Sequence, residues 1–291
     1  MEITGWLIYS KKDAQKNKSY IQWMIAEADK QNIHLTLVFR EQLTIGVIEQ
    51  NPQAVIHNQY SQLPMIAIVR TIEPMLNIHL ESLGIQVFNS STIATLCNHK
   101  SLTHLAINKL HIPMVQTLFM NKNCLPQTPP LSFPFVVKDA RGRGGKHVYL
   151  VNNVEQWEAS IEKIETKDFL VQTCDVQHGR DVRVFVVGKK IIGAVLRKST
   201  ADFRANYTLG GSATWYELRR KDREIVQRIV NYFNFGMVGI DFLLDKDGQL
   251  LFNEIEDVVG SRTLSVVSDI NILEHYMDYI QTSYQQFSSR K

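Results

Sequence analysis

GRDVRVFVVGKKIIGAVLRKS, at residues 179–199, and IDFLLDKDGQLLFNEI, at residues 240–255, each hold two alternating apolar runs around a tight turn. The turn contains Gly188 in the first stretch and Gly248 in the second. Glycine between two alternating runs is typical of a β-hairpin. Apolar residues at helical spacing between the two stretches predict a helix over 221–233. The last third of the chain is therefore expected to form two hairpins separated by a helix.

The first ninety residues have a different pattern, because short apolar runs alternate with helical stretches. The runs that read as strands are 6–9, 33–39, 54–57, 65–69 and 85–88. An amphipathic helix from Ile21 to Ala28 is expected between the first two. We expect a small α/β domain with a mostly parallel sheet at 1–88. The first strand is not followed by GxGxxG, so the sequence does not indicate a dinucleotide site.

Residues 89–170 are expected to form a second unit, and residues 171–291 a third. The elements expected in the second are helices over 91–96 and 101–110, strands at 115–119, 135–138, 147–151 and 169–172, and a helix that opens at Asn153. The proline-rich stretch 124–134 is interpreted as a linker.

Length and composition exclude several classes of protein. Of the 291 residues, 44% are hydrophobic and 21% are charged, which is ordinary for a globular protein. No apolar run approaches the ~20 residues that span a bilayer, and no leader pattern opens the chain. We therefore expect a soluble, cytoplasmic protein with no membrane partner. Three cysteines without CxxC spacing indicate reduced thiols, and His99 and His104, five residues apart, are interpreted as ordinary helix residues.

The net charge of +3 is unevenly distributed along the chain. Residues 1–100 have a net charge of 0, residues 101–211 of +6 and residues 212–291 of −3. A basic middle and an acidic end suit a polyphosphate with its divalent cation, although a nucleic-acid groove or a solvated surface has the same pattern. The basic residues surround glycines and hairpins and form no dense run with interleaved aromatics, so we expect no nucleic-acid partner.

Lys138 ends the apolar run FPFVVK, and the loop ARGRGG at 140–145 comes directly after Asp139. An unpaired charge is costly to bury at the end of a strand. A flexible loop with spare N–H groups beside fixed positive charge can close over phosphates. The loop is not a P-loop, because Lys146 is followed by His147 and by a strand. The alternative interpretation is an edge-strand lysine beside a surface turn.

Three carboxylates are expected to meet on the last hairpin. Glu254 and Glu256 lie two residues apart and point to the same face, with Asp241 on the partner strand. Like charges ~4 Å apart repel by about 1 kcal/mol in water and by ~4 kcal/mol at an effective dielectric of 20, so such a cluster favours a bound cation. Mg²⁺ takes oxygen ligands and bridges carboxylates to phosphates. The alternative is three solvated acids on an exposed face.

The stretch between the first hairpin and the helix contains Arg204 and Asn206 beside Phe203. An arginine neutralises charge on a transferring phosphoryl group, and an asparagine adds a metal or phosphate contact. The alternative is a plain mobile connection that ends in Gly210 and Gly211.

In their order these elements resemble the ATP-grasp fold, and the series DVRVFVVG, DFRAN, GG and GIDF resembles the RimK-type amino-acid ligases of that superfamily. The resemblance covers residues 89–265. It implies an α/β fold that is α+β in its catalytic part, with an N-terminal Rossmann-like pre-ATP-grasp domain at 1–88. A central subdomain with a glycine-rich lid at 89–170 and a C-terminal subdomain with Mg-binding carboxylates at 171–291 would follow. A homo-oligomer is also implied.

The activity that this resemblance implies is ATP- and Mg²⁺-dependent ligation of a carboxylate to an amine. The γ-phosphoryl group of ATP would pass to the carboxylate, and the amine would then displace phosphate from the acyl phosphate to form an amide. The substrates would be small-molecule or peptide carboxylates and amines. A covalent enzyme nucleophile is not needed.

The resemblance also implies roles for individual residues. Those implied to contact ATP are Lys100, Lys138, Arg143, Gly144, Gly145, Arg204 and Asn206 at the phosphates, Gln172, Thr173 and Cys174 at adenine, and Asp181 at the ribose. Asp241, Glu254 and Glu256 would bind Mg²⁺. Arg204 and Arg262 would be catalytic, the first at the tetrahedral intermediate and the second on a substrate carboxylate.

The sequence departs from the family pattern after the last strand. Glu256 stands where a metal-binding asparagine is expected, and Asp257 to Gly260 replace a Pro-Gly turn. A carboxylate can still bind Mg²⁺, but the altered loop lies where the substrates would meet. This departure motivates the alternative of an ATP-binding module without ligase activity.

Overall fold

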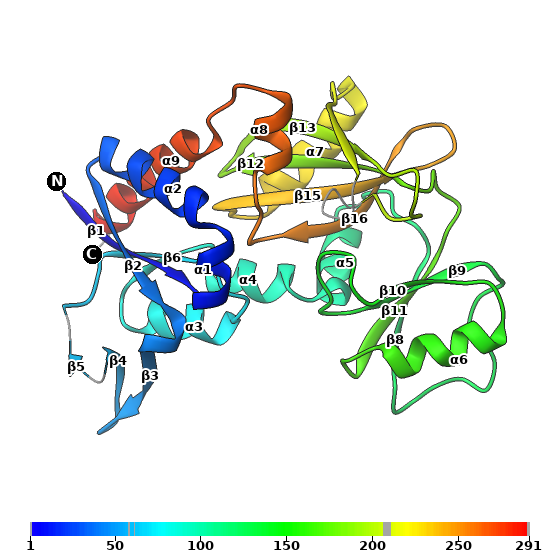
Figure 1. The fold of residues 1–291 in the computed structure, drawn as a ribbon, viewed down its shortest axis with the longest axis horizontal. Helices are drawn as coiled ribbons and strands as arrows, with labels where there is room; N and C mark the ends of the chain where they lie inside the picture. Colours follow the sequence, from blue (N-terminus) through cyan, green and yellow to red (C-terminus); the bar gives the residue numbers. More distant parts are fainter. Residues whose placement is uncertain (1, 58, 61, 206–210, 290–291) are drawn as a thin grey trace.

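In the computed structural model, residues 2–57, 59–60, 62–205 and 211–289 are described, and they contain four β-sheets (Figure 1). The first sheet is parallel, with strand order β2-β1-β6-β7. The N-terminal elements around it are β1 (Ile3–Tyr9), α1 (Lys11–Lys16), α2 (Lys18–Lys30), β2 (Ile33–Phe39), η1 (Arg40–Gln42), β6 (Ile66–Val69), α3 (Pro74–Ser82) and β7 (Gln86–Phe88). Leu7 belongs to one buried cluster and Ile8 to another, so β1 is covered on both faces and reads as a continuous apolar run.

The strand predicted at 54–57 exists but does not join the parallel sheet. It lies in β4 (Asn51–Ile56), which pairs antiparallel with β3 (Leu43–Ile48) and with β5 (Gln59–Tyr60). A parallel neighbour needs a crossover of a dozen or more residues, and the chain between β3 and β4 is far too short for one. The hairpin therefore forms a separate three-stranded sheet.

A second four-stranded sheet has the order β10-β9-β11-β8 and is antiparallel throughout. The elements of this part of the chain are α4 (Ser91–Cys97), α5 (Lys100–Asn108), β8 (Thr117–Asn121), β9 (Phe135–Asp139), β10 (Val148–Val151), α6 (Val154–Lys163) and β11 (Asp168–Thr173). The Asn153 side chain caps α6, as predicted. Trp157 on α6 contacts Phe135 and Phe169 and closes the core of this sheet.

The largest sheet has the order β14-β13-β12-β15-β16. Its strands are β12 (Arg180–Val187), β13 (Lys190–Lys198), β14 (Ser212–Trp215), β15 (Met237–Leu244) and β16 (Leu250–Glu256), and the helix α7 (Arg220–Tyr232) lies between β14 and β15 in sequence. Both predicted hairpins are confirmed, and Gly188 and Gly248 have positive φ angles of 57° and 75° at their turns. The helix predicted over 221–233 is α7, whose buried residues Val226 and Ile229 belong to the core cluster beneath the sheet.

Three strands of the structure were not predicted: β3, β5 and β14. Residues 197–215 were interpreted as a loop, but β13 extends to Lys198 and β14 pairs with it antiparallel. The Trp215 ring lies over Gly193, where an added Cβ would come within 2.9 Å of it. Because Gly193 has no side chain, the Trp215 ring and its edge strand have room to pack there. This packing joins residues that are far apart in sequence, so the sequence pattern does not predict it.

Two C-terminal helices, α8 (Arg262–Val267) and α9 (Ile272–Ser288), complete the fold. In Figure 1, α9 lies beside α2 and the parallel sheet, although it follows the largest sheet in sequence. Met24 of α2, Phe185 of β12 and Met277 of α9 belong to one buried cluster. The two ends of the chain therefore share a core. Among the described residues, no helix has the length and apolar character that crossing a membrane requires.

Candidate functional site

A cleft between the β8–β11 sheet and the β12–β16 sheet gathers most of the residues that the sequence singled out. Those that line it are Lys100, Lys138, Arg143, Gly145, Gln172, Thr173, Cys174, Asp181, Arg204 and Glu254. Gly144, Glu256 and Arg262 line a neighbouring cavity. Asp241 is buried behind the cleft, and Asn206 lies outside the described residues.

Two lysines of this cleft reach neighbouring residues of β16, Glu254 and Asn253. Lys100 opens α5, and its Nζ lies 3.1 Å from Oε2 of Glu254. Lys138 on β9 donates from Nζ to Oδ1 of Asn253 at 2.8 Å. Burial lowers the pKa of Lys138 to about 8. Burial by itself would raise the pKa of Glu254, but Lys100 and Lys138 lower it, so the carboxylate is ionised at neutral pH.

Gln172 is oriented by a hydrogen-bond chain that begins in α5. Nδ1 of His104 lies 2.8 Å from the carbonyl oxygen of Lys100, so this nitrogen carries the proton and donates it. Burial lowers the pKa of His104 to about 4, so the ring is neutral and Nε2 accepts from the Gln172 amide at 3.1 Å. The same amide donates to Oγ1 of Thr117 at 2.9 Å. Oε1 of Gln172 is left buried in the cleft without a partner among the described residues.

His104 therefore has a role that the sequence interpretation missed. It is 2% exposed and sets the direction of Gln172, whereas the sequence interpretation had treated it as an ordinary helix residue. An unpaired buried acceptor is costly and suits a ligand that carries an N–H donor, such as the amino group of adenine.

The glycine-rich loop 141–146 lies across the cleft, and three cations hold it there. Lys100 donates to the carbonyl oxygen of Gly142, and Arg204 donates to that of Gly145. Arg143 donates to Asn98 at 2.7 Å and to Asp257 at 3.2 Å. With the loop in this position the cleft encloses about 100 Å³. Small-molecule sites usually enclose about 300–1,000 Å³, so the cleft with the loop in this position is smaller than such a site.

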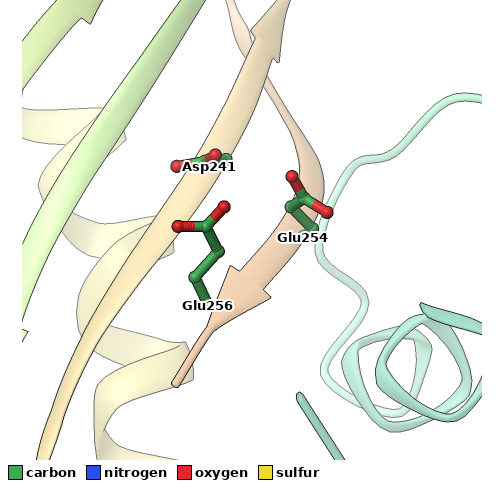
Figure 2. A group of neighbouring side chains, drawn as sticks. All are labelled: Asp241, Glu254 and Glu256. Carbon is green, nitrogen blue, oxygen red and sulfur yellow. The ribbon is translucent and has the colours of Figure 1, made fainter. Parts of the chain in front are cut away.

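The three carboxylates predicted on the last hairpin do meet (Figure 2). Asp241 on β15 pairs with Glu254 on β16, and Glu256 pairs with Gly239 two positions along the ladder. One oxygen of each carboxylate lies within 4.8 Å of the others. An all-oxygen donor set of this kind fits Mg²⁺.

Two buried arginines, Arg183 and Arg197, hold the carboxylates on the side away from the cleft. Arg183 donates to both oxygens of Asp241 at 2.6 Å and lies 2.9 Å from Glu256. Arg197 donates to both oxygens of Asp181, at 2.5 and 2.8 Å, and to Asp241 at 2.8 Å. Burial by itself would raise the pKa of Asp241, but the two arginines lower it to about 2. Burial raises the pKa of Asp181 to about 6, against the effect of Arg197.

The sequence contained a signal for Arg183 and Arg197 that was not used. Asp181 and Arg183 alternate in an otherwise apolar strand, so both point to one face, and the hairpin pairs Asp181 with Arg197. Asn253 had no such signal. The β15–β16 register shifts between Asp241 and Phe242, so Asn253 has no partner residue there and its side chain reaches Lys138.

A second cavity of about 800 Å³ lies beside the carboxylates and is strongly basic. Its charged residues are Lys16, Arg143, Arg183, Arg197 and Arg262, together with Glu256. We refer to it as the basic cavity. Arg262 is exposed at the start of α8, 3.4 Å from Oδ1 of Asn17 on the N-terminal unit. The basic cavity thus lies between the first and third units, next to the acidic end of the cleft.

Comparison with known proteins gives consistent results. A family model described as a RimK-like ATP-grasp domain matches residues 95–280. Glutamate–LysW ligase ArgX of Sulfurisphaera tokodaii is 27% identical over 216 residues, which cover 71% of this chain and 77% of that protein. Beta-citrylglutamate synthase B of Danio rerio is 26% identical over 244 residues, which cover 78% of this chain and 60% of that protein.

Solved structures share the same architecture. The D-alanine–D-alanine ligase of Bacillus anthracis, complexed with ATP, has a TM-score of 0.74 at 15% identity and covers 99% of this chain and 100% of its own. At this identity the likeness concerns the fold.

Proposed function

Because this chain belongs to the RimK-like ATP-grasp family, whose members join a carboxylate to an amine with ATP, we propose that the cleft binds ATP and that the basic cavity binds a carboxylate group of a substrate. The ATP-grasp fold and the ligase activity predicted from the sequence are confirmed. The chain is an ATP-dependent ligase that forms carbon–nitrogen bonds. The observation that supports the proposed sites is that Lys100 contacts Glu254 and Lys138 contacts the adjacent Asn253 at one end of the cleft.

The residues in the cleft fit ATP and Mg²⁺. Lys100, Lys138 and Arg204 would bind the phosphates, and the unpaired oxygen of Gln172 would accept from the adenine amino group. The all-oxygen set of Asp241, Glu254 and Glu256 would hold Mg²⁺, which, when bound, neutralises phosphate charge. Glu254 and Glu256 would offer the more accessible oxygens, because the oxygens of Asp241 already accept from Arg183 and Arg197.

The reaction requires positioning and neutralisation of charge, and no enzyme nucleophile. A substrate carboxylate oxygen attacks the γ-phosphorus, and the bond to the β,γ-bridging oxygen breaks. ADP is the leaving group, and the product of this step is an acyl phosphate. The amine then attacks the acyl carbon, loses a proton, and expels phosphate to form the amide. Lys138 and Arg204 would stabilise the charge on the transferring group, and Arg204 would also stabilise the oxyanion of the tetrahedral intermediate.

The charge of the basic cavity indicates an anionic substrate. Five cationic side chains and one carboxylate line it. Arg143, Arg183 and Arg197 are already paired with carboxylates, so Lys16 and Arg262 are the cations that would bind an anionic group. Glutamate appears in the names of both curated relatives described above, so we propose L-glutamate as one of the two substrates.

The first experiment is an ADP-release assay with Mg·ATP, L-glutamate and a panel of amino acids, combined with calorimetric titration of ATP with and without Mg²⁺. Lys138→Ala and Glu254→Gln should each lower turnover by at least ~100-fold, since Lys138 would neutralise charge on the transferring group and Glu254 would hold Mg²⁺. Lys190→Ala and Glu158→Gln change exposed residues far from the cleft and should leave the rate unchanged. Normal turnover in a folded Lys138→Ala variant would contradict the proposed site.

A further inference from the structure

A third cavity of about 480 Å³ separates the N-terminal unit from α8, and it has no role in the reaction described above. We call it the α2–α8 cavity. Its principal wall residues are Lys16, Tyr20, Trp23, Ser261, Arg262 and Val266. The volume lies in the range of small-molecule sites.

The α2–α8 cavity adjoins the basic cavity. Lys16, Asn17 and Arg262 line both of them, and the basic cavity reaches Glu256 of the carboxylate cluster. A substrate whose reacting group lies near Glu256 can therefore extend between Lys16 and Arg262 into the α2–α8 cavity. These two cations suit a carboxylate at the passage between the cavities.

Two buried hydroxyl groups are left without hydrogen bonds at this cavity. Ser261 is 1% exposed, and neither its Oγ nor the hydroxyl of Tyr20 has a partner among the described residues. Ser261 is near enough to lower the pKa of Tyr20, but the two groups do not have the geometry of a hydrogen bond. Burial raises the pKa of Tyr20 overall, so the phenol keeps its proton at neutral pH and can donate it. One polar ligand group that reached both hydroxyls would satisfy them together.

The other walls are apolar. Trp23 is half-buried and packs edge-on against Tyr20 with 5.9 Å between ring centroids. Val266, on α8, is 64% exposed. A flat apolar group between Trp23 and Val266 would cover both side chains, and aromatic rings bury large areas at such surfaces.

We propose that the α2–α8 cavity is the side-chain subsite for the amine substrate, and that it selects an aromatic amino acid with a polar group at the tip of its ring. The ring lies between Trp23 and Val266, the tip reaches Tyr20 and Ser261, and the carboxylate lies between Lys16 and Arg262. This assignment rests on the proposed ligase function for its place in the reaction, but binding in the cavity can be measured without ATP.

The test is calorimetric titration of the whole chain with three probes: L-tyrosine, L-phenylalanine and L-tyrosinamide. L-Tyrosine should bind about tenfold more tightly than L-phenylalanine, which has no polar tip, and more tightly than L-tyrosinamide, which has no carboxylate. Tyr20→Phe and Ser261→Ala should each remove the preference for tyrosine over phenylalanine. Tyr232→Phe and Ser212→Ala, at exposed positions away from the cavity, should retain it.

Val266→Ser is a second variant, because an exposed position tolerates the change without loss of folding. It should lower the affinity for all three probes by a similar factor and leave the affinity for ATP unchanged. Equal affinity for the three probes, or an unchanged preference in both hydroxyl variants, would overturn the proposal. If tyrosine binds as expected but no ADP is released with any substrate pair, the subsite stands and the proposed function fails.

Discussion

Lys138 is a cationic side chain whose surroundings lower its pKa. It is enclosed between β9 and β16, and burial lowers its pKa to about 8 although Glu254 acts in the opposite direction. Phosphate binding requires the ammonium form. The side chain is therefore charged at neutral pH, but it loses this charge at a pH only slightly above neutral.

We predict that the affinity for Mg·ATP falls as the pH rises through about 8. At pH 9.5 only a few per cent of Lys138 would be protonated, so the dissociation constant should increase by up to ~30-fold relative to pH 7. The measurement is calorimetric titration across this range. Lys138→Arg keeps its charge at all these pH values, so its affinity should change much less. The same pH dependence in both proteins would show that another group is responsible.

At the scale of elements, the lid loop 141–146 is attached to both sides of the cleft. Lys100 and Arg204 bind its carbonyl oxygens, and Arg143 binds Asp257 in the loop that departs from the family pattern. The lid and the altered loop after β16 are therefore connected, and cations proposed to bind phosphate already contact the lid.

Arg143→Ala should loosen the lid, because the contacts to Asn98 and Asp257 are lost together. We expect faster hydrogen–deuterium exchange at Gly142 and Gly145 and a several-fold higher KM for ATP. Arg141→Ala is the matched control, since Arg141 is an exposed residue of the same loop. Equal exchange in the two variants would mean that the contact with Asp257 does not hold the lid.

At the scale of the whole molecule, the first and last parts of the chain fold against each other. α9 follows the catalytic strands in sequence, yet it packs in one core with α2 and with β12. The sheet of β8–β11 has a separate core under α6. The cleft thus lies between the β8–β11 sheet, which has its own core, and the rest of the molecule, whose core is built from both ends of the chain.

Met277→Ala tests this arrangement. Met277 is fully buried on α9 in the shared core, so its truncation should lower the free energy of unfolding by ~3 kcal/mol. The measurement is urea unfolding followed by circular dichroism. Gln285→Ala, at an exposed position on the same helix, should have almost no effect. A negligible loss of stability in Met277→Ala would mean that α9 contributes little to the common core.

The sequence by itself determined the local elements and the types of chemistry. The hairpins with Gly188 and Gly248, the cap at Asn153 and the shared face of Glu254 and Glu256 all follow from residues that are close in the chain. Each depends on a turn, a cap or an alternation whose period is set by the backbone, so a short stretch is enough to predict it.

Only the tertiary structure decided which side chains meet across elements. Arg183 and Arg197 hold Asp241, His104 directs Gln172, and β14 joins the sheet over Gly193. The α2–α8 cavity likewise combines the two ends of the chain. These contacts join residues tens to hundreds of positions apart, and periodicity says which face a side chain occupies but not which distant element packs against that face. The register shift beside Asp241 had the same origin, because the bulge is visible only once β15 and β16 are paired.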